Sequence, residues 1–382
     1  MQTNTERILT THTGSLPRPD DVVELLWRRA RREAVDEEAV ADRVREAVAE
    51  VVRQQVAVGL DVVNDGETGK LSYSTYVRDR LTGFAEAPDA RGPIASDLSD
   101  FPDYRARLSS EGASRRVPRV ACVGPVAYRG QAALERDLAD MRAAIADSAT
   151  ADVFLSAASP GVIALFHPNR HYPRHEDYDW ALAEAMREEY EAIYRAGFLL
   201  QLDCPDLAAG YHMNPGGMRQ DDFRRAAAFH VEALNRATAA IPPERMRLHL
   251  CWGNYEGPHH HDLPLREIVA VILDARPAGL SVEAANPRHG HEWRVWEEVP
   301  LPDGKVLIPG VVDTTTNFVE HPELVAERIT RFARVVGRER VVAGTDCGFA
   351  TVAGSARVDP AIAWAKLGAL VEGARLASEE LW

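Results

Sequence analysis

The order of hydrophobic and polar positions repeats four times along the chain. Each repeat has an amphipathic segment, a glycine, a short apolar run and then a polar residue, and the repeats span residues 57–67, 195–205, 277–286 and 335–348. A glycine after an amphipathic segment is typical of a helix C-cap, and an unbroken apolar run is typical of a strand buried on both faces. The pattern therefore predicts helices that lead into buried parallel strands.

Two helices can be predicted individually from their apolar faces. In residues 322–336, the side chains at helical spacing on one face are Val325, Ile329, Phe332 and Val336. Pro322 suits a first helical turn, and Gly337 is placed to end the helix. In residues 177–196, the corresponding face consists of Leu182, Met186, Tyr190 and Ile193.

Apolar runs of strand length occur eight times. They are residues 8–13, 61–65, 152–157, 199–203, 247–251, 280–283, 307–311 and 341–345. Eight strands that alternate with helices favour a (β/α)8 TIM barrel, formed as one domain by residues 1–382. Residues 83–130, rich in Gly, Pro and Asp, predict a hairpin-containing insertion after the second strand. A doubly wound open sheet competes, but no Gly-rich dinucleotide turn follows the first strand and no linker divides the chain.

Composition narrows the class of protein. The 382-residue chain is 46% hydrophobic and 27% charged, and its formal net charge is −14. This charge argues against nucleic-acid or membrane-surface partners, and no uncharged apolar segment is long enough to predict a membrane helix. The sequence MQTNTERILT lacks the basic and hydrophobic regions of a secretory signal, so we expect a cytoplasmic location. In a cytosolic protein, a few scattered cysteines are more often metal ligands or nucleophiles than a disulfide framework.

Polar residues at the predicted strand ends supply candidate chemistry, because barrel active sites lie at the carboxyl ends of the strands. His249 and Cys251 alternate on the fifth strand, so their side chains share one face. Glu283 ends the sixth strand, and Cys347 follows the eighth. Each residue alone fits an ordinary core or salt-bridge position, but together they form a suitable tetrahedral set for Zn²⁺. Cys122, in the insertion and without ligand-like neighbours, is expected only to pack.

Seven short motifs, HTGSLP, NDGE, LQLDCP, HLC, SVE, IPGVVD and GTDCG, occur in one order along most of the chain. This order resembles the catalytic barrel of cobalamin-independent methionine synthase and its single-barrel relatives. The resemblance implies a zinc-bound thiolate that attacks an alkyl donor. The positions that it assigns to zinc are His249, Cys251, Glu283 and Cys347. Those that it assigns to the amino-acid end of the thiol substrate are Thr13, Gly14, Ser15, Glu67 and Asp203. The acidic residues expected to be catalytic are Glu67, Asp203 and Asp313.

Two departures from the family pattern bear on the alkyl donor. Thr315 stands where methionine synthases carry a histidine shortly after the aspartate of strand seven. Threonine cannot take up a proton near pH 7, so the residue that protonates a folate leaving group is unassigned. The long methionine synthases also carry an additional N-terminal barrel, for which this sequence has no counterpart.

The acceptor thiol is open between two chemical classes. Glu67 and Asp203 suit the ammonium group of a homocysteine-type thiol, whereas a sulfonate thiol such as coenzyme M requires cationic partners. The candidates for those cations are Arg18, Lys70, Arg288 and His289. The consecutive histidines His259, His260 and His261 are expected to form a loop at the barrel mouth rather than a second metal site. Adjacent side chains of a regular segment do not readily converge on one ion.

The leading hypothesis is a zinc-dependent transferase that moves a methyl or other alkyl group to a small-molecule thiol. Opening of an epoxide by a coenzyme M-type thiol is the alternative within the same chemistry. A metal-free enzyme resembling uroporphyrinogen decarboxylase is disfavoured by the predicted zinc set. A non-catalytic zinc- or thiol-binding protein is disfavoured by the polar residues at the other strand ends. The insertion is left open between a lid and a contact between the copies of a homo-oligomer.

Overall fold

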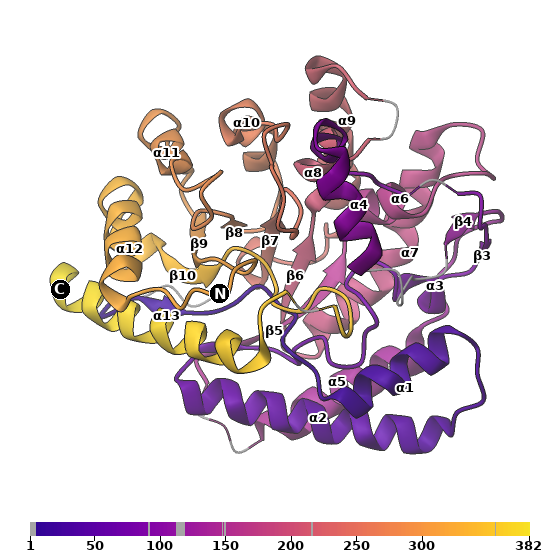
Figure 1. The fold of residues 1–382 in the computed structure, drawn as a ribbon, viewed down its shortest axis with the longest axis horizontal. Coiled ribbons are helices and arrows are strands. Elements are labelled where there is room, and N and C mark those ends of the chain that lie inside the picture. Colours follow the sequence, from indigo (N-terminus) through magenta and orange to yellow (C-terminus); the bar gives the residue numbers. More distant parts are fainter. Residues whose placement is uncertain are drawn as a thin grey trace.

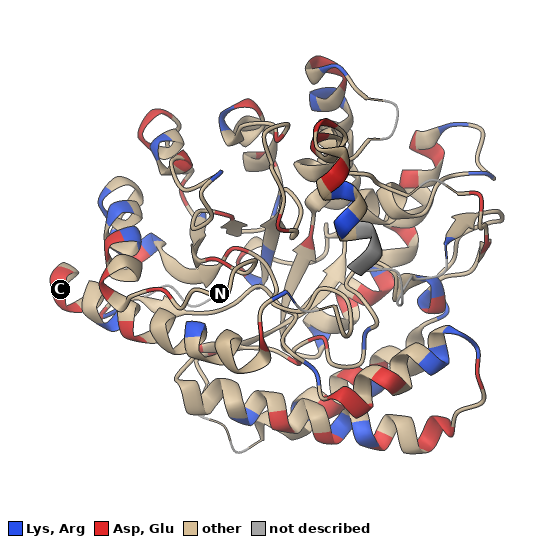
Figure 2. Cartoon of the chain, viewed as in Figure 1, with Lys and Arg blue, Asp and Glu red and all other residues tan. Residues whose placement is uncertain are grey.

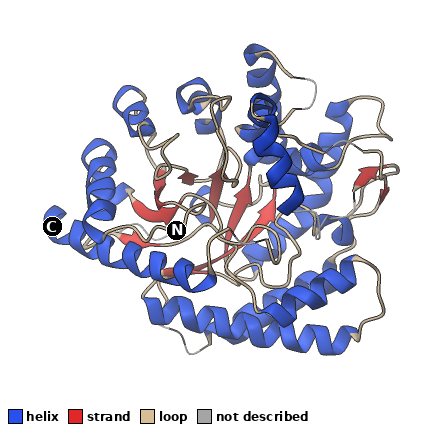
Figure 3. Ribbon diagram, viewed as in Figure 1, coloured by secondary structure: helices blue, strands red, loops and turns tan. Residues whose placement is uncertain are grey.

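Eight parallel strands surrounded by helices form the centre of the molecule in the computed structural model (Figure 1, Figure 3). The structure describes residues 5–90, 92–111, 119–146, 148, 150–214, 217–355 and 357–382. The barrel strands are β1 (Leu9–Thr10), β2 (Val62–Val63), β5 (Asp152–Ala158), β6 (Leu199–Asp203), β7 (Met246–Leu250), β8 (Gly279–Val282), β9 (Val306–Val312) and β10 (Val342–Thr345). These strands confirm the eight predicted runs and the predicted (β/α)8 barrel.

The barrel is nearly closed. Strand pairing runs in the order β1-β10-β9-β8-β7-β6-β5-β2. Between β1 and β2, the Asp61 N–H donates to Thr10 O over 3.2 Å, and the Thr11 hydroxyl donates to Val62 O over 3.2 Å. The Asp61 carboxylate also accepts from the Thr10 N–H at 2.8 Å. β1 and β2 are shorter than the apolar runs that predicted them.

The outer helices follow the barrel strands. They are α1 (Asp20–Ala30), α2 (Glu37–Val58), α5 (Gln131–Ile145), α6 (Pro160–Phe166), α7 (His175–Arg195), α8 (Ala209–His212), α9 (Gln220–Ala237), α10 (Val269–Leu273), α11 (Val295–Glu298), α12 (Pro322–Val336) and α13 (Pro360–Leu381). α12 has the predicted bounds: the His321 ring accepts from the Glu323 N–H at its start, and Gly337, with φ +94°, ends it. α7 confirms the second predicted helix and buries its predicted face.

The predicted insertion between the second and third barrel strands contains the expected hairpin. β3 (Phe84–Glu86) pairs antiparallel with β4 (Val120–Cys122). The short helix α3 (Val77–Arg80) precedes β3, and between β3 and β4 lie the 3-10 helix η1 (Ser96–Asp100) and α4 (Pro102–Glu111). Cys122 is buried, as expected of a packed residue, and its thiol donates to Gly124 O over 3.4 Å.

Charged side chains lie mainly on the helices and loops, whereas the central strands are largely uncharged (Figure 2). Arg247 on β7 is an exception, because it is buried inside the barrel. Its guanidinium donates to the Thr11 hydroxyl at 2.9 Å and to His12 O at 2.6 Å, and lies 4.1 Å from the centre of the Phe154 ring. None of the helices in the described part of the chain has the length and apolar character that a membrane crossing needs.

Candidate functional site

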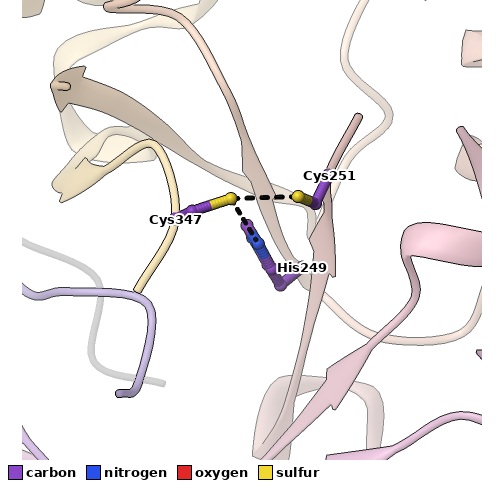
Figure 4. Close-up of side chains that lie close together, drawn as sticks. All are labelled: His249, Cys251 and Cys347. Atoms are coloured by element: carbon purple, nitrogen blue, oxygen red, sulfur yellow. Dashed lines mark hydrogen bonds between the residues drawn. The ribbon is translucent and has the colours of Figure 1, made fainter. Parts of the chain in front are cut away.

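Three potential metal ligands converge at the carboxyl ends of β7 and β10 (Figure 4). His249 and Cys251 alternate at the end of β7, so both side chains point to one side, and Cys347 approaches them from the loop after β10. The Cys347 sulfur lies 3.0 Å from the Cys251 sulfur and 3.6 Å from His249 Nε2. The ligand atoms all lie within 4.8 Å of one another, and the three residues are buried. The structure therefore brings His249, Cys251 and Cys347 together, as expected from the sequence.

The pKa shifts of Cys251 and His249 favour metal binding, whereas that of Cys347 opposes it. Both cysteines are free thiols, and the hydrogen bond between them lowers the pKa of Cys251 and raises the pKa of Cys347. The Gly253 N–H donates to the Cys251 sulfur at 3.1 Å, which further stabilises a thiolate there. Burial lowers the pKa of His249, so its imidazole is neutral and offers a lone pair. A thiolate, a second thiol and a neutral imidazole are donors that fit zinc.

Glu283, at the end of β8, lies beside this group. One of its oxygens lies 3.7 Å from the Cys347 sulfur and accepts from the Trp252 N–H at 2.8 Å. The other accepts from the Asn286 side chain at 2.7 Å. Burial, and then the charge of Cys251, raise the pKa of Glu283 to about 8. Each carboxyl oxygen thus already accepts a hydrogen bond from the protein, and the role of Glu283 as a fourth ligand stays a prediction.

A cavity of about 240 Å³ adjoins the three ligands. We call it the first cavity, and the residues that define it here are Thr13, Ser15, Glu67, Asp203, His249, Cys251 and Cys347. It therefore brings the side chains predicted to bind the thiol substrate against those predicted to bind zinc. The described residues that line it include no Lys or Arg. Its charged wall is acidic, which favours a cationic group on the ligand.

The two carboxylate oxygens of Glu67 have different surroundings. Its backbone has a φ of +55°, in the turn after β2, and its Oε1 accepts from the Ser156 hydroxyl at 2.8 Å. Its Oε2 is buried without a hydrogen-bond partner among the described residues. Burial, and then the charge of Glu67, raise the pKa of Asp203 to about 7, while the Gln201 amide donates to Asp203 at 2.8 Å. An ammonium group bound here would pair with Glu67 and relieve the repulsion between the two carboxylates.

Gly14 has no side chain, and this lets the Glu67 carboxylate lie close to its backbone. A Cβ atom at position 14 would lie 2.7 Å from Glu67 Oε1, and the φ of Gly14 is +153°. Gly14 therefore packs closely against the Glu67 carboxylate, while the neighbouring Thr13 and Ser15 line the first cavity, and the substrate-binding role of Gly14 stays a prediction.

A second cavity, of about 370 Å³, lies against the same cysteine. The residues that it shares with the first cavity are Gly253, Asn254, Tyr255 and Cys347. Asp313 and Thr315 line only the second cavity. The Asp313 carboxylate accepts from the N–H and hydroxyl of Thr315, at 3.1 and 2.8 Å, and from those of Thr316, at 2.9 and 2.5 Å. Asp313 therefore shapes its own loop, and its predicted catalytic role remains a prediction.

Sequence reasoning missed a buried network of histidines and carboxylates beside the second cavity. Asp262 accepts from His259 Nδ1 at 2.8 Å and from His289 Nε2 at 2.9 Å, and His289 Nδ1 donates to Glu292 at 2.9 Å. Burial lowers the pKa of both histidines, but Asp262 raises the pKa of His259 to about 9, and Asp262 and Glu292 raise that of His289 to about 10. The signal available in the sequence was the spacing of a carboxylate three residues after His259, which suits a turn.

Comparisons with known proteins place this chain among the cobalamin-independent synthases. The profile of one family, described as the catalytic domain of cobalamin-independent synthase, matches residues 8–103 and 132–373. A methionine synthase of Saccharolobus solfataricus is 25% identical over 377 residues, which are 97% of this chain and 95% of that protein. A 2-hydroxypropyl-CoM lyase of Xanthobacter autotrophicus is 25% identical over 371 residues, which are 90% of this chain and 87% of that protein.

The fold has a counterpart among solved structures. A B12-independent methionine synthase from a Shewanella species, in complex with selenomethionine, superposes with a TM-score of 0.74 at 20% identity. The superposition covers 98% of this chain and 99% of the Shewanella chain. It supports the barrel architecture.

Proposed function

The chain belongs to the family of cobalamin-independent synthase catalytic domains, and we propose that it is a zinc-dependent transferase that moves a methyl or other alkyl group to a thiol bearing an ammonium group, as in homocysteine. The first cavity carries this proposal: two carboxylates face the three clustered ligands, and its described walls include no Lys or Arg.

The residues that would hold zinc are His249, Cys251 and Cys347, with Glu283 beside them as the fourth ligand. When bound, zinc stabilises the thiolate form of a substrate sulfur, which in a free thiol of pKa about 8.5 is a minor form at neutral pH. The donor set supports this assignment, since two sulfurs, an imidazole and a carboxylate suit zinc better than they suit magnesium or calcium.

The first cavity would bind the amino-acid end of the thiol. The unpaired oxygen of Glu67 accepts from the ammonium group, and Asp203 adds a second negative charge on the same wall. Thr13 and Ser15 line this wall as polar neighbours of the substrate carboxylate. His249, Cys251 and Cys347 line the same cavity, so a thiol held by its ammonium group at Glu67 would have its sulfur near these three ligands.

The second cavity would receive the alkyl donor. Cys347, Asn254 and Tyr255 line both cavities, so a donor in the second cavity would lie next to the sulfur site. Thr315 lines this cavity with its hydroxyl bonded to Asp313, in the place where the family carries a histidine. The Asp313 carboxylate would position this wall for the donor.

Epoxide opening by coenzyme M is the second candidate, because a 2-hydroxypropyl-CoM lyase is among the relatives. The sulfonate of coenzyme M requires cationic side chains, but most of the cationic side chains predicted for this role are bonded to other groups of the protein. The Arg18 guanidinium donates to Glu67 O and Ala350 O, and Lys70 Nζ donates to Ser156 O. His289 bonds to two carboxylates, and Arg288 lines only the second cavity. The first cavity therefore favours an ammonium thiol.

Binding of matched thiols to the zinc-loaded protein tests the proposal. Homocysteine and 4-mercaptobutyrate differ only in the ammonium group, and their dissociation constants can be measured by isothermal titration calorimetry beside that of coenzyme M. Loss of a charge-assisted bond of about 1.5–3 kcal/mol should weaken 4-mercaptobutyrate by roughly 10- to 100-fold. Coenzyme M should bind no more tightly than 4-mercaptobutyrate.

Tight binding of coenzyme M with weak binding of homocysteine would instead support the epoxide-opening reaction. Equal affinities for homocysteine and 4-mercaptobutyrate would remove Glu67 and Asp203 from the proposed role. A protein that takes up no zinc would contradict the proposed chemistry as a whole and return the metal-free decarboxylase hypothesis to consideration.

A further inference from the structure

A second group of potential metal ligands lies outside the site described above. Asp100 is the last residue of η1 in the insertion, and His260 and His261 lie in the loop after β7. The Asp100 carboxylate oxygen lies 2.8 Å from His260 Nε2 and 3.0 Å from His261 Nε2. These three ligand atoms all lie within 4.8 Å of one another.

This arrangement corrects one expectation from the sequence. Consecutive histidines do form a loop, as predicted, but two of them converge on one point, contrary to the prediction. That prediction assumed a regular segment, whereas the chain turns here: His259 has a φ of +53°, and residues 260 and 261 form a turn. The turn brings two adjacent imidazoles to the same side.

We propose that Asp100, His260 and His261 form a second site for a divalent transition-metal ion, of the zinc, cobalt or nickel class. Two imidazoles and one carboxylate are a donor set for these ions, whereas magnesium and calcium prefer oxygen donors. The side chains of Asp100, His260 and His261 are 50%, 39% and 37% exposed, so an ion can enter from solvent and keep water on its open positions. This set contains no sulfur ligand, in contrast to the site formed by His249, Cys251 and Cys347, which we call the cysteine site.

Ser96 supplies a further feature of a metal site. Its hydroxyl lies 2.9 Å from His261 Nδ1 and can accept the proton of that nitrogen. This leaves the lone pair on His261 Nε2, which faces the Asp100 carboxylate. A hydrogen-bond partner on the other ring nitrogen is the usual way in which a protein orients a metal-binding histidine.

An ion bound by Asp100, His260 and His261 would link the insertion to the loop that follows β7. Other contacts already join them: the Tyr255 hydroxyl donates to Asp97 at 2.6 Å, the His259 N–H donates to Asp97 at 2.7 Å, and the Tyr104 hydroxyl donates to Glu256 O. Tyr255 lines both cavities, and His259 lines the second. A metal ion at Asp100 would therefore stabilise the loop that forms walls of both cavities, whatever reaction the cavities support.

Cobalt binding to the full-length protein separates the two sites. Cobalt at the cysteine site gives an intense sulfur-to-metal charge-transfer band, whereas cobalt bound by histidine and carboxylate gives only weak visible bands. We expect about two equivalents per chain in the wild type and about one in His261→Ala, with the charge-transfer band retained. Cys251→Ala should show the converse: loss of the band and retention of the weaker site. His171→Ala, at an exposed position on another loop, is the matched control and should bind like the wild type.

Two conservative variants guard against a folding defect. Asp100→Asn keeps the size of the side chain, and Ser96→Ala removes only the partner of His261. Ser96→Ala should lower the affinity for the second metal equivalent by roughly 10- to 100-fold. Zinc added in excess should slow amide hydrogen exchange in residues 96–104 and 255–262 of the wild type but not of Asp100→Asn. A wild type that binds a single equivalent, or a second equivalent that survives His261→Ala and Asp100→Asn, would overturn the proposal.

Discussion

The sulfur atoms of Cys251 and Cys347 lie 3.0 Å apart, although 96 residues separate the two cysteines in the chain. Cys251 follows β7 and Cys347 follows β10, with β8 and β9 between them in the barrel. The two thiols are free and share one hydrogen bond. Their approach across the barrel end, next to His249, is the basis of the first prediction.

Replacement of Cys251 by alanine should remove the zinc ion. The wild type is expected to contain about one zinc per chain when zinc is the only metal supplied and the second site is stripped by a mild chelator. In Cys251→Ala the content should fall to a small fraction, because a thiolate ligand is lost. Elemental mass spectrometry measures both proteins. Cys122→Ala, a buried cysteine of the insertion, should retain the metal, and equal zinc in Cys251→Ala and the wild type would contradict the assignment.

Glu67→Gln should weaken thiol binding without loss of zinc. The substitution removes the negative charge that faces the ammonium group but keeps the size of the side chain and the bond to the Ser156 hydroxyl. We expect KM for the thiol to rise roughly 10- to 100-fold, from a charge-assisted interaction of about 1.5–3 kcal/mol. Steady-state kinetics and metal analysis test this together. Glu176→Gln, on the exposed start of α7, is the control, and a zinc-free Glu67→Gln protein would point to a structural role instead.

Gly14→Ala should weaken thiol binding in the first cavity by a steric clash rather than by a loss of charge. The added Cβ would lie 2.7 Å from Glu67 Oε1, so either the backbone or the carboxylate must move. We expect a loss of unfolding free energy of about 1–3 kcal/mol together with weaker thiol binding. Urea unfolding and calorimetry measure the two effects.

Gly368→Ala provides a control of the opposite sign. Gly368 lies inside α13 and has no atom within 4 Å of an added Cβ. Alanine there should raise the unfolding free energy by about 0.5–1 kcal/mol, because glycine disfavours a helix interior. If Gly14→Ala behaved like Gly368→Ala, the Gly14 site would tolerate a side chain and the packing explanation would fail.

The buried His289 predicts a pH dependence of stability. His289 faces Asp262 and Glu292, which raise its pKa from 6.5 to about 10, with a smaller contribution from Glu283. A histidine whose pKa is higher in the folded state binds more protons folded than unfolded between these values. Its stabilising contribution is therefore complete below pH 6.5 and is lost as the pH rises towards 10.

The difference in unfolding free energy between the wild type and His289→Gln isolates this effect. We expect the wild type to be more stable by roughly 1–3 kcal/mol near the acidic end of this range and the difference to shrink towards its alkaline end. Urea titrations across the range, at constant metal content, measure it. The exposed His171→Gln should show no such trend. A difference that grows with pH would mean that His289 is neutral in the folded protein.

Local patterns predicted the barrel and part of the site. The apolar runs and glycine caps predicted eight strands because burial and helix termination leave local marks in the sequence. His249 and Cys251 were assigned to one face because side chains alternate along a strand. The placement of Glu283 was predicted less well: it lies near Cys347, but the Trp252 N–H and Asn286 hold it. Such side-chain hydrogen bonds follow no sequence period.

The sequence by itself determined the order of strands and helices and the residue types at the strand ends, since both depend on short-range spacing. Only the tertiary structure decided which of these side chains meet. It placed two cavities against Cys347, left one oxygen of Glu67 without a partner among the described residues, and brought Asp100 to His260 across 160 residues of chain. These contacts depend on the closure of the barrel and on the path of the insertion over its end, and long-range packing of this kind leaves no periodic pattern along the chain.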